Sequence, residues 1–437
     1  MVDTWRAASR LVAVAAIMLT ALLATSPGAL AQSPSTATAP AAAVPINTSI
    51  ADAPEISLVT YGPGEIYWER FGHNAILVRD PVSGEAIAYN YGIFDFDDDD
   101  FFWNFARGLM RYRIAAVRFD DDLPIYVDEG RSVTEQRLQM SAQQRIALRD
   151  FLRWNTQPEN AYYRYDYFTS NCSTKVRDAL DQGLGGLLKQ QSTGRSQGYT
   201  YRIDALRLMS PDAWLMLIVD LGLGPYADQR IDFWQESFVP MTLAKVVRSA
   251  QTSGDGATPV ALVSEERTLA RGRIAEPPEL PPDLRWPFLF VGLGSGILML
   301  VLARLRSSPV ARVALSILAF VFSLTCCIGG SVLLALWGLT DHRSAWRNEN
   351  LLLLSPLCLL LLPTWIGSSR VRWKPRFWTQ VVAWTIAAIA SFALFSKTLP
   401  GFVQANLHWI VLFLPIHVAL ALTIARQRSA IAGLKPS

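Results

Sequence analysis

The pattern of apolar and polar positions divides the chain into two parts of different character. From about Trp286 onward, long apolar runs of near spanning length alternate with short polar connections. A helix needs roughly 20 apolar residues to cross a bilayer. The pattern therefore predicts five membrane-spanning helices, at residues 286–303, 313–338, 350–367, 377–396 and 407–425.

The part before these spans shows the shorter periods of strands and amphipathic helices. Alternation in "EISLVTYG", "NAILVRD" and "EAIAYNYGIF" is typical of strands, and "PVSG" between the last two favours a hairpin. We expect a helix from Asp99 or Asp100 to the Gly108 region, then a strand around "YRIAAVRF". Helical spacing follows in "VTEQRLQMSAQQRIALRDFLRWNT" and in "CSTKVRDALDQGL". This mixture predicts an α+β domain.

The N-terminal residues have the features of an export signal. Arg6 and Arg10 precede the apolar run "LVAVAAIMLTALLA", and "ALA" has the small-residue form of a cleavage site. An uncleaved anchor helix is the alternative, although the run is shorter than a spanning helix. The next stretch, rich in Pro, Ala, Ser and Thr, is typical of a disordered linker. The expected organisation is a signal peptide at 1–31, a linker at 32–55, an extracytoplasmic domain at 56–247, a connector at 248–285 and a membrane domain at 286–427.

Charge and composition add an orientation to this picture. The 437 residues are 51% hydrophobic and carry a formal net charge of +3, which is too small to indicate a nucleic-acid partner. Ten Lys and Arg residues lie after spans one and three and in the tail, against three in the opposite loops. The positive-inside rule then places residues 32–285 outside the cytoplasm and the C-terminus inside, as in a bacterial inner-membrane protein.

Cys172 is the only cysteine before the spans, because Cys326, Cys327 and Cys358 lie within them. It therefore has no disulfide partner in its own domain. A buried cysteine that packs as a small hydrophobe, or an intermolecular disulfide, is the alternative to a reactive thiol. Its place at the start of a predicted helix lowers a thiol pKa, because the helix dipole and free N–H groups favour the thiolate.

His73 is the only histidine of the extracytoplasmic domain. The other three, His342, His408 and His417, lie in or beside predicted spans, where His417 near mid-span is the better functional candidate. A lone histidine is usually an ordinary structural residue. The sole His and the sole Cys of one domain, each at the boundary of an element, nevertheless form the minimum pair for nucleophilic catalysis.

A third residue that orients the imidazole follows from the hairpin register. If "PVSG" joins the two strands, His73 lies opposite Gly92 and Asn90 points to the same face. An amide there would hold one imidazole tautomer, as the third group does in cysteine enzymes. The alternatives for this role are Tyr89, Glu85 and Asp95.

Several motifs, in this order, carry a resemblance to a known family. "FGHNAI", "YNYGIFDF", "FARGLMRY" and "YRYDYFTSNCSTKVRD" resemble the extracytoplasmic domain of the Lnb-type lipoprotein N-acyltransferases, which belong to the permuted papain-like (NlpC-like) group. In that group the histidine precedes the cysteine, and the cysteine opens a helix packed on a sheet. The family is also similar in carrying five membrane helices after this domain, so the resemblance extends over residues 56–425.

The resemblance implies a function and roles for individual residues. Cys172 would attack an ester of a membrane phospholipid and form a thioester, and the α-amine of a diacylated lipoprotein would then take the acyl chain. His73 would be the base, and backbone N–H groups near Ser173 and Thr174, at a helix start that Asn171 supports, would bind the oxyanion. No metal or cofactor is expected, because a Cys/His mechanism needs neither.

Other readings of the same residues remain. The permuted papain-like fold also suits a peptidase or amidase, and water in place of the amine would make a phospholipase-like hydrolase. A membrane scaffold whose lone Cys and His have no catalytic role is the third alternative. The aromatic run "YYRYDYF" either lines an acyl-chain groove or belongs to the core.

Overall fold

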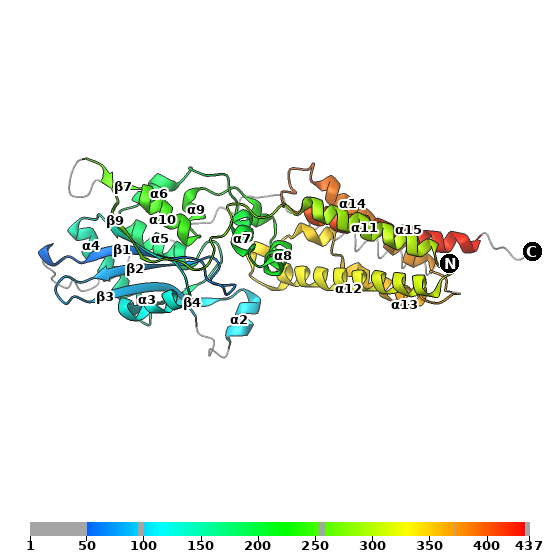
Figure 1. Cartoon of the computed structure of the whole chain (residues 1–437), viewed down its shortest axis with the longest axis horizontal. Helices are drawn as coiled ribbons and strands as arrows, with labels where there is room; N and C mark the ends of the chain where they lie inside the picture. Colours follow the sequence, from blue (N-terminus) through cyan, green and yellow to red (C-terminus); the bar gives the residue numbers. More distant parts are fainter. Residues whose placement is uncertain (1–49, 95–99, 253–257, 372, 433–437) are drawn as a thin grey trace, which may run out of the picture. The chain divides into compact units, whose positions relative to one another are not determined.

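The computed structural model describes residues 50–94, 100–252, 258–371 and 373–432, drawn in Figure 1. The expected signal peptide and most of the expected linker lie outside the described residues. The described residues form two compact units. We call the unit that holds residues up to Asp220 and Gln229–Pro281 the sheet unit, and the unit that holds Leu221–Asp228 and the chain from Pro282 onward the helical unit.

The sheet unit is built on one antiparallel sheet of seven strands in the order β6-β4-β3-β2-β1-β5-β9. The predicted hairpin is confirmed, because β2 pairs with β3 and Ala75 lies opposite Asn90. The strands are β1 (Glu55–Tyr61), β2 (His73–Arg79), β3 (Ala86–Ile93), β4 (Arg111–Arg118), β5 (Val133–Leu138), β6 (Tyr162–Arg164) and β9 (Val263–Ala270). β7 (Gln251–Thr252) and β8 (Val260–Ala261) form a separate pair.

Helices cover both faces of the sheet, as Figure 1 shows. Apolar residues of β1, β2 and β3 alternate between two buried clusters, because neighbouring strand positions face opposite sides. On one face α3 packs through Phe119, Leu123 and Tyr126. On the other face α4, α5 and α10 contribute Leu148, Val176 and Leu243, among others. The helices of this unit are α2 (Phe101–Arg107), α3 (Phe119–Asp128), α4 (Ala142–Asn155), α5 (Cys172–Gly183), α6 (Leu187–Ser192), α7 (Tyr201–Met209), α8 (Ala213–Gly222, which ends in the helical unit), α9 (Phe233–Glu236) and α10 (Pro240–Ser249).

Two sequence predictions need correction here. The helix expected from "VTEQRL" onward begins only at Ala142, because Val133–Leu138 is a strand hydrogen-bonded to β1 on one side and β9 on the other. The helix start is set by a capping box in which Ser141 accepts the Gln144 N–H and the Gln144 side chain accepts the Ser141 N–H. The second correction concerns the connector expected at 248–285, because β9 lies within it and the sheet therefore extends past residue 247.

The helical unit contains five apolar helical segments long enough to cross a membrane, counted over the described residues, which confirms the predicted number. The segments are α11 (Arg285–Arg304), α12 (Pro309–Leu339), the segment Glu349–Ser368, α14 (Phe377–Ser396) and α15 (Leu407–Ala432). The third segment is broken into η4 (Glu349–Leu352), η5 (Pro356–Leu361) and α13 (Leu362–Ser368). Such irregular backbone at membrane depth must be satisfied by protein groups.

His417 of α15 supplies one of these groups. Its Nε2 lies 2.8 Å from the carbonyl oxygen of Leu353, at the break between η4 and η5. The side chain is buried. The structure thus gives this mid-span histidine a partner in the broken helix, which is a structural reason for an ionisable group at that depth.

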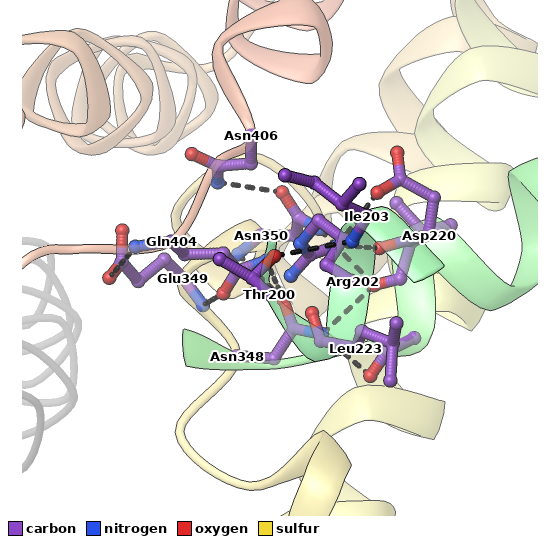
Figure 2. A network of polar contacts seen from close by, with 12 residues as sticks. Thr200, Arg202, Ile203, Asp220, Leu223, Asn348, Glu349, Asn350, Gln404 and Asn406 are labelled. Carbon is purple, nitrogen blue, oxygen red and sulfur yellow. Dashed lines mark hydrogen bonds and ion pairs between the residues drawn. The ribbon is translucent and has the colours of Figure 1, made fainter. Parts of the chain in front are cut away.

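The same unit contains a buried polar network, and Figure 2 labels Asn348, Glu349, Asn350, Gln404 and Asn406 of it. Asn348 Nδ2 lies within 2.9–3.2 Å of the carbonyl oxygens of Leu221, Gly222 and Leu223. Gln404 and Asn406 hydrogen-bond to Asn348 and Asn350, and Lys397 forms an ion pair with Glu349. These contacts join the segments around residues 222, 349 and 404 within the helical unit. In the sheet unit, Arg202 of α7 donates to Asp220 Oδ1 over 2.7 Å (Figure 2).

Candidate functional site

Cys172 is the first residue of α5, and the start of this helix is held by a capping box. Asn171 Oδ1 accepts the Thr174 N–H at 2.9 Å, and Thr174 Oγ1 accepts the Asn171 N–H at 2.8 Å. Asn171 Nδ2 also donates to the Phe238 carbonyl at 2.8 Å. The position of the thiol is therefore set by the cap and by the segment before α10.

Ser173 connects the first turn of α5 to the sheet through hydrogen bonds of its hydroxyl group. Its hydroxyl is fully buried and lies 2.9 Å from Asn74 Oδ1 and 2.7 Å from the Ser237 carbonyl oxygen. Because Asn74 follows His73 directly in β2, this contact joins the start of the cysteine helix to the strand that carries the histidine. A buried hydroxyl needs such partners, since an unpaired one costs about 1–3 kcal/mol.

Gly92 explains how the thiol fits against the sheet. Its φ is +92°, a conformation that side chains rarely adopt, and a Cβ placed on it would lie 3.2 Å from Cys172 Cβ. The pairing of β2 with β3 ends at Ala75 opposite Asn90, and His73 and Gly92 each lie two residues beyond that pair. The thiol and the imidazole are thus brought to the same end of the β2–β3 hairpin from residues that are far apart in sequence.

Burial raises the pKa of the Cys172 thiol to about 11, against an ordinary value of 9.0. The backbone N–H groups of Asn74, Ser173 and Cys172 itself act in the opposite direction, as does the charge of Arg131. The expectation of a thiolate at the helix start is therefore wrong for the resting site, because desolvation outweighs the donors of the helix N-terminus. A thiol with such a pKa acts as a nucleophile at neutral pH only when a base takes its proton.

His73 is oriented by the residue that the hairpin register predicted. Its Nε2 lies 2.9 Å from Asn90 Oδ1, and Asn90 Nδ2 donates to Asp122 Oδ1 at 3.2 Å. Tyr61 donates its hydroxyl proton to the other oxygen of Asp122 at 2.5 Å. Because the amide nitrogen faces the carboxylate, the amide oxygen faces the ring, so Nε2 carries the proton and Nδ1 is the basic nitrogen.

The other candidates for the orienting role lie elsewhere. Tyr89 points into the cluster on the opposite face of the sheet, and Glu85 is exposed at the hairpin turn. Asp95 lies outside the described residues. Asp122 of α3 was not found by sequence reasoning, since one acid in the run "DDD" gives no sign that it is the buried one.

The His73 imidazole is also surrounded by the rings of Tyr126 and Tyr61 and by the buried guanidinium of Arg131. Tyr126 of α3 stacks on His73 with centroids 6.0 Å apart and on Tyr61 at 3.7 Å. Arg131 lies over the Tyr126 ring, with its Cζ 4.7 Å from the centroid. Burial lowers the pKa of His73 to about 4; the Asn90 hydrogen bond opposes this and the charge of Arg131 adds to it. The imidazole is therefore neutral at physiological pH.

Arg131 is a second residue that the sequence did not single out. Only 4% of it is exposed, and its Nε donates to the Gly62 carbonyl at 2.8 Å while Nη1 pairs with Glu129 at 3.2 Å. Its Nη2 is buried without a hydrogen-bond partner among the described residues. A fixed positive charge beside the site favours negative charge that develops there.

The arrangement brings together a thiol, a neutral imidazole and backbone N–H donors. Among the described residues, no hydrogen bond joins the Cys172 sulfur to the His73 ring, a contact that in cysteine and serine enzymes often tightens only with substrate. The N–H groups of Asn74 and Ser173 point at the sulfur. The Thr174 N–H is committed to the Asn171 side chain and so, in contrast to the expectation, is not free to bind an oxyanion. Within the described ranges no group of three His, Cys, Asp or Glu side chains is placed to hold a metal ion.

Comparison with known proteins gives two matches, both to family models. The model "Lnb N-terminal periplasmic domain" matches residues 43–210, and the model "Lnb transmembrane domain" matches residues 287–429. The chain belongs to the Lnb family. No curated protein and no solved structure matched the chain. Membership in the Lnb family, with a periplasmic α+β domain and five helices that can span a membrane, indicates an inner-membrane enzyme that processes lipoproteins.

The raised pKa of Cys172 predicts a slow reaction with alkylating agents at neutral pH. At pH 8 a thiol with a pKa of about 11 is ionised about 100-fold less than one at 9.0. We therefore expect the iodoacetamide rate constant to keep rising from pH 7 to 10, measured by peptide mass spectrometry with a free cysteine peptide as reference. A rate constant that levels off below pH 7 would show that Cys172 rests as a thiolate, and it would contradict a neutral thiol beside a neutral His73.

Gly92 is required for two reasons, its positive φ and the closeness of Cys172, and Gly92→Ala tests both. We expect a loss of about 1–3 kcal/mol of stability from the strained φ, and a loss of activity because the methyl group crowds Cys172. Gly84→Ala is the matched control, since Gly84 has a φ of +73° but nothing within 4 Å of the added Cβ. Thermal unfolding should shift in both variants, whereas turnover should fall only in Gly92→Ala. Equal turnover in the two variants would refute the close approach.

Proposed function

We propose that the chain transfers an acyl chain from a glycerolipid ester, through a thioester on Cys172, to the α-amine of a diacylglyceryl-cysteine lipoprotein. The observation that carries this proposal is the placement of a half-buried thiol at the start of α5, beside backbone N–H donors and next to the strand of an oriented, neutral histidine. The Lnb family models and the five spans support a lipidic substrate, because they keep such a site at a membrane.

In the first half-reaction the Cys172 sulfur bonds to the ester carbonyl carbon while its proton passes to His73 Nδ1. The carbonyl oxygen becomes an oxyanion, for which the N–H groups of Asn74 and Ser173 and the charge of Arg131 are the available partners. When the tetrahedral intermediate collapses, the C–O bond of the ester breaks and the leaving alkoxide takes the proton from His73. The products are a thioester and a glycerolipid alcohol.

The second half-reaction returns the enzyme to its starting state. The α-amine attacks the thioester carbonyl, and His73 accepts a proton from the amine. The C–S bond then breaks, and the departing sulfur takes that proton. The product is an amide, and Asn90 with Asp122 keeps the same imidazole nitrogen available in both steps. In this proposal the domain is a permuted papain-like fold facing the periplasm, and the C-terminus is cytoplasmic.

Intact-mass spectrometry of the full chain in phospholipid vesicles tests the proposal. We expect a hydroxylamine-sensitive acyl adduct on the wild type and none on Cys172→Ala, and we expect a diacylated lipopeptide to discharge it as an N-acyl product. Deuterated acyl chains on the lipopeptide distinguish the two sources of the ester, since a light adduct comes from the phospholipid and a heavy one from the lipopeptide itself. Discharge to free fatty acid alone would make the enzyme a hydrolase, and the absence of any adduct would overturn the thioester route.

A further inference from the structure

Helix α2 exposes several large aromatic side chains on one short element, which is unusual for a surface that faces only water. None of its seven residues, Phe101–Arg107, is buried. Phe102 is 71% exposed, Trp103 63% and Phe105 38%. Exposed apolar groups that cluster on one short element mark an interaction surface, whereas single exposed apolar residues do not.

A series of ring contacts leads from this helix into the sheet unit. Phe101 stacks on Phe94 at the end of β3, with centroids 5.7 Å apart. Phe94 contacts Tyr112 of β4 at 5.2 Å, and Tyr112 contacts Tyr165 at 4.3 Å. The four rings form a continuous apolar path from the exposed helix to the segment just before α5.

The path ends beside the candidate nucleophile. Tyr165 contacts Tyr167, with ring centroids 6.0 Å apart, and the Tyr167 carbonyl accepts a hydrogen bond from Asn171 Nδ2 at 3.2 Å, directly before Cys172. The loop between β1 and β2 also carries exposed aromatic rings, in which Tyr67 and Trp68 contact each other with centroids 4.6 Å apart. Tyr67 and Trp68 of this loop are 52% and 46% exposed and add to the aromatic surface.

We infer that α2 inserts its exposed rings into the periplasmic leaflet of the membrane and that the series Phe101, Phe94, Tyr112 and Tyr165 guides a lipid acyl chain toward Cys172. This inference rests on the proposed function and adds the route by which the substrate enters. Trp and Phe are favoured at membrane interfaces, and the sheet unit ends at Pro281, directly before the first span at Arg285, so its surface is tethered to a bilayer.

The expected docking is apolar rather than electrostatic. The sequence "DDDD" at 97–100 immediately precedes α2, so attraction to anionic lipids does not account for binding at this point. Membrane contact through buried aromatic rings is insensitive to salt, whereas attraction between charges is screened at high ionic strength. The two sources of binding can therefore be distinguished by adding salt.

The first test compares long-chain and short-chain substrates. In Phe102→Glu and Trp103→Glu we expect acyl-enzyme formation from vesicles of phosphatidylethanolamine and phosphatidylglycerol to fall by about tenfold or more. Formation from a butyryl ester in detergent should fall less than twofold, because a short chain does not need the path. Val82→Glu is the matched control, since Val82 is 74% exposed at the β2–β3 turn, and it should behave as the wild type in both assays.

The second test does not depend on catalysis. A bimane label on Phe102→Cys, in a Cys172→Ala chain reconstituted in the same vesicles, should be quenched by brominated lipid at low and high salt. The same label on Val82→Cys should not be quenched. If the wild type forms no acyl-enzyme at all, the proposed function fails, and the quenching alone then decides whether α2 is in the membrane.

Three results would overturn the inference. One is an equal loss with both substrates in the α2 variants, which would indicate a structural role. Another is an unchanged rate with vesicle lipid. The third is the absence of quenching at position 102, or its disappearance at high salt.

Discussion

Cys172→Ser is expected to lower acyl transfer by roughly 10⁴-fold or more, because a serine hydroxyl in this site has neither the acidity nor the nucleophilicity of the thiol. In the proposed mechanism the thiol, with its pKa raised to about 11, depends on His73 for activation, and the much less acidic hydroxyl would depend on it further. The change is small in volume. The helix start is held by Asn171, Ser173 and Thr174, so we expect the melting temperature to shift by less than about 4 °C.

The matched control is Cys327→Ser, at a half-buried cysteine in α12. This variant should retain both the acyl adduct and turnover, measured by intact-mass spectrometry and by release of N-acylated lipopeptide. Wild-type turnover by Cys172→Ser would exclude the thioester route. A Cys172→Ser protein that fails to insert or unfolds early would show that residue 172 has a structural role, and Cys172→Ala would then be compared with it.

His73→Gln is expected to produce the second largest loss, about 10²–10⁴-fold in kcat. Glutamine is close to histidine in length and can still hydrogen-bond to Asn90, but it cannot accept and return a proton. The loss should therefore lie in the chemical step and leave the KM for lipid nearly unchanged. Because burial lowers the pKa of His73 to about 4, the acid limb of the wild-type pH profile should fall near that value rather than near 6.5.

His408→Gln is the control for this substitution, because His408 lies in α15, in the helical unit. It should retain turnover and the wild-type pH profile. The measurements are single-turnover formation of the acyl-enzyme from pH 4 to 9 and its discharge by the lipopeptide amine. A loss of less than tenfold in His73→Gln, or an acid limb that does not change, would assign the role of base to another group.

The hairpin shows how far local rules reach into the site. Alternation and the turn signal "PVSG" predicted β2, β3 and their register, and the register put Asn90 on the face of His73, where the structure has a hydrogen bond of 2.9 Å. The start of α5 at Cys172 was also predicted, because the change of pattern at "NCST" coincides with a capping residue. The hairpin register and the helix start depend on neighbouring residues or on a two-residue period, and both can be read directly from the sequence.

Features that depend on distant partners were missed or misread. Val133–Leu138 has helical spacing, yet pairing with β1 and β9 on both sides makes it a strand, since two ladders outweigh a local preference. Asp122 and Arg131 are ordinary charged residues in sequence and become part of the site only where α3 and the following loop cover the sheet. The thiol pKa was misjudged because the helix start is visible in sequence, whereas the burial that opposes it is not.

The sequence by itself determined the membrane part and the α+β character of the first domain, and it predicted an orientation from Lys and Arg and the two residues proposed as nucleophile and base. Each of these follows from composition or from short periods along the chain. Only the tertiary structure decided that burial keeps the thiol neutral, that the Asn74 N–H lies at the sulfur whereas the Thr174 N–H is bound to the Asn171 side chain, and that Asp122 orients the amide of Asn90. The physical reason is that solvation and hydrogen-bond direction depend on groups brought together across the sheet, far apart along the chain.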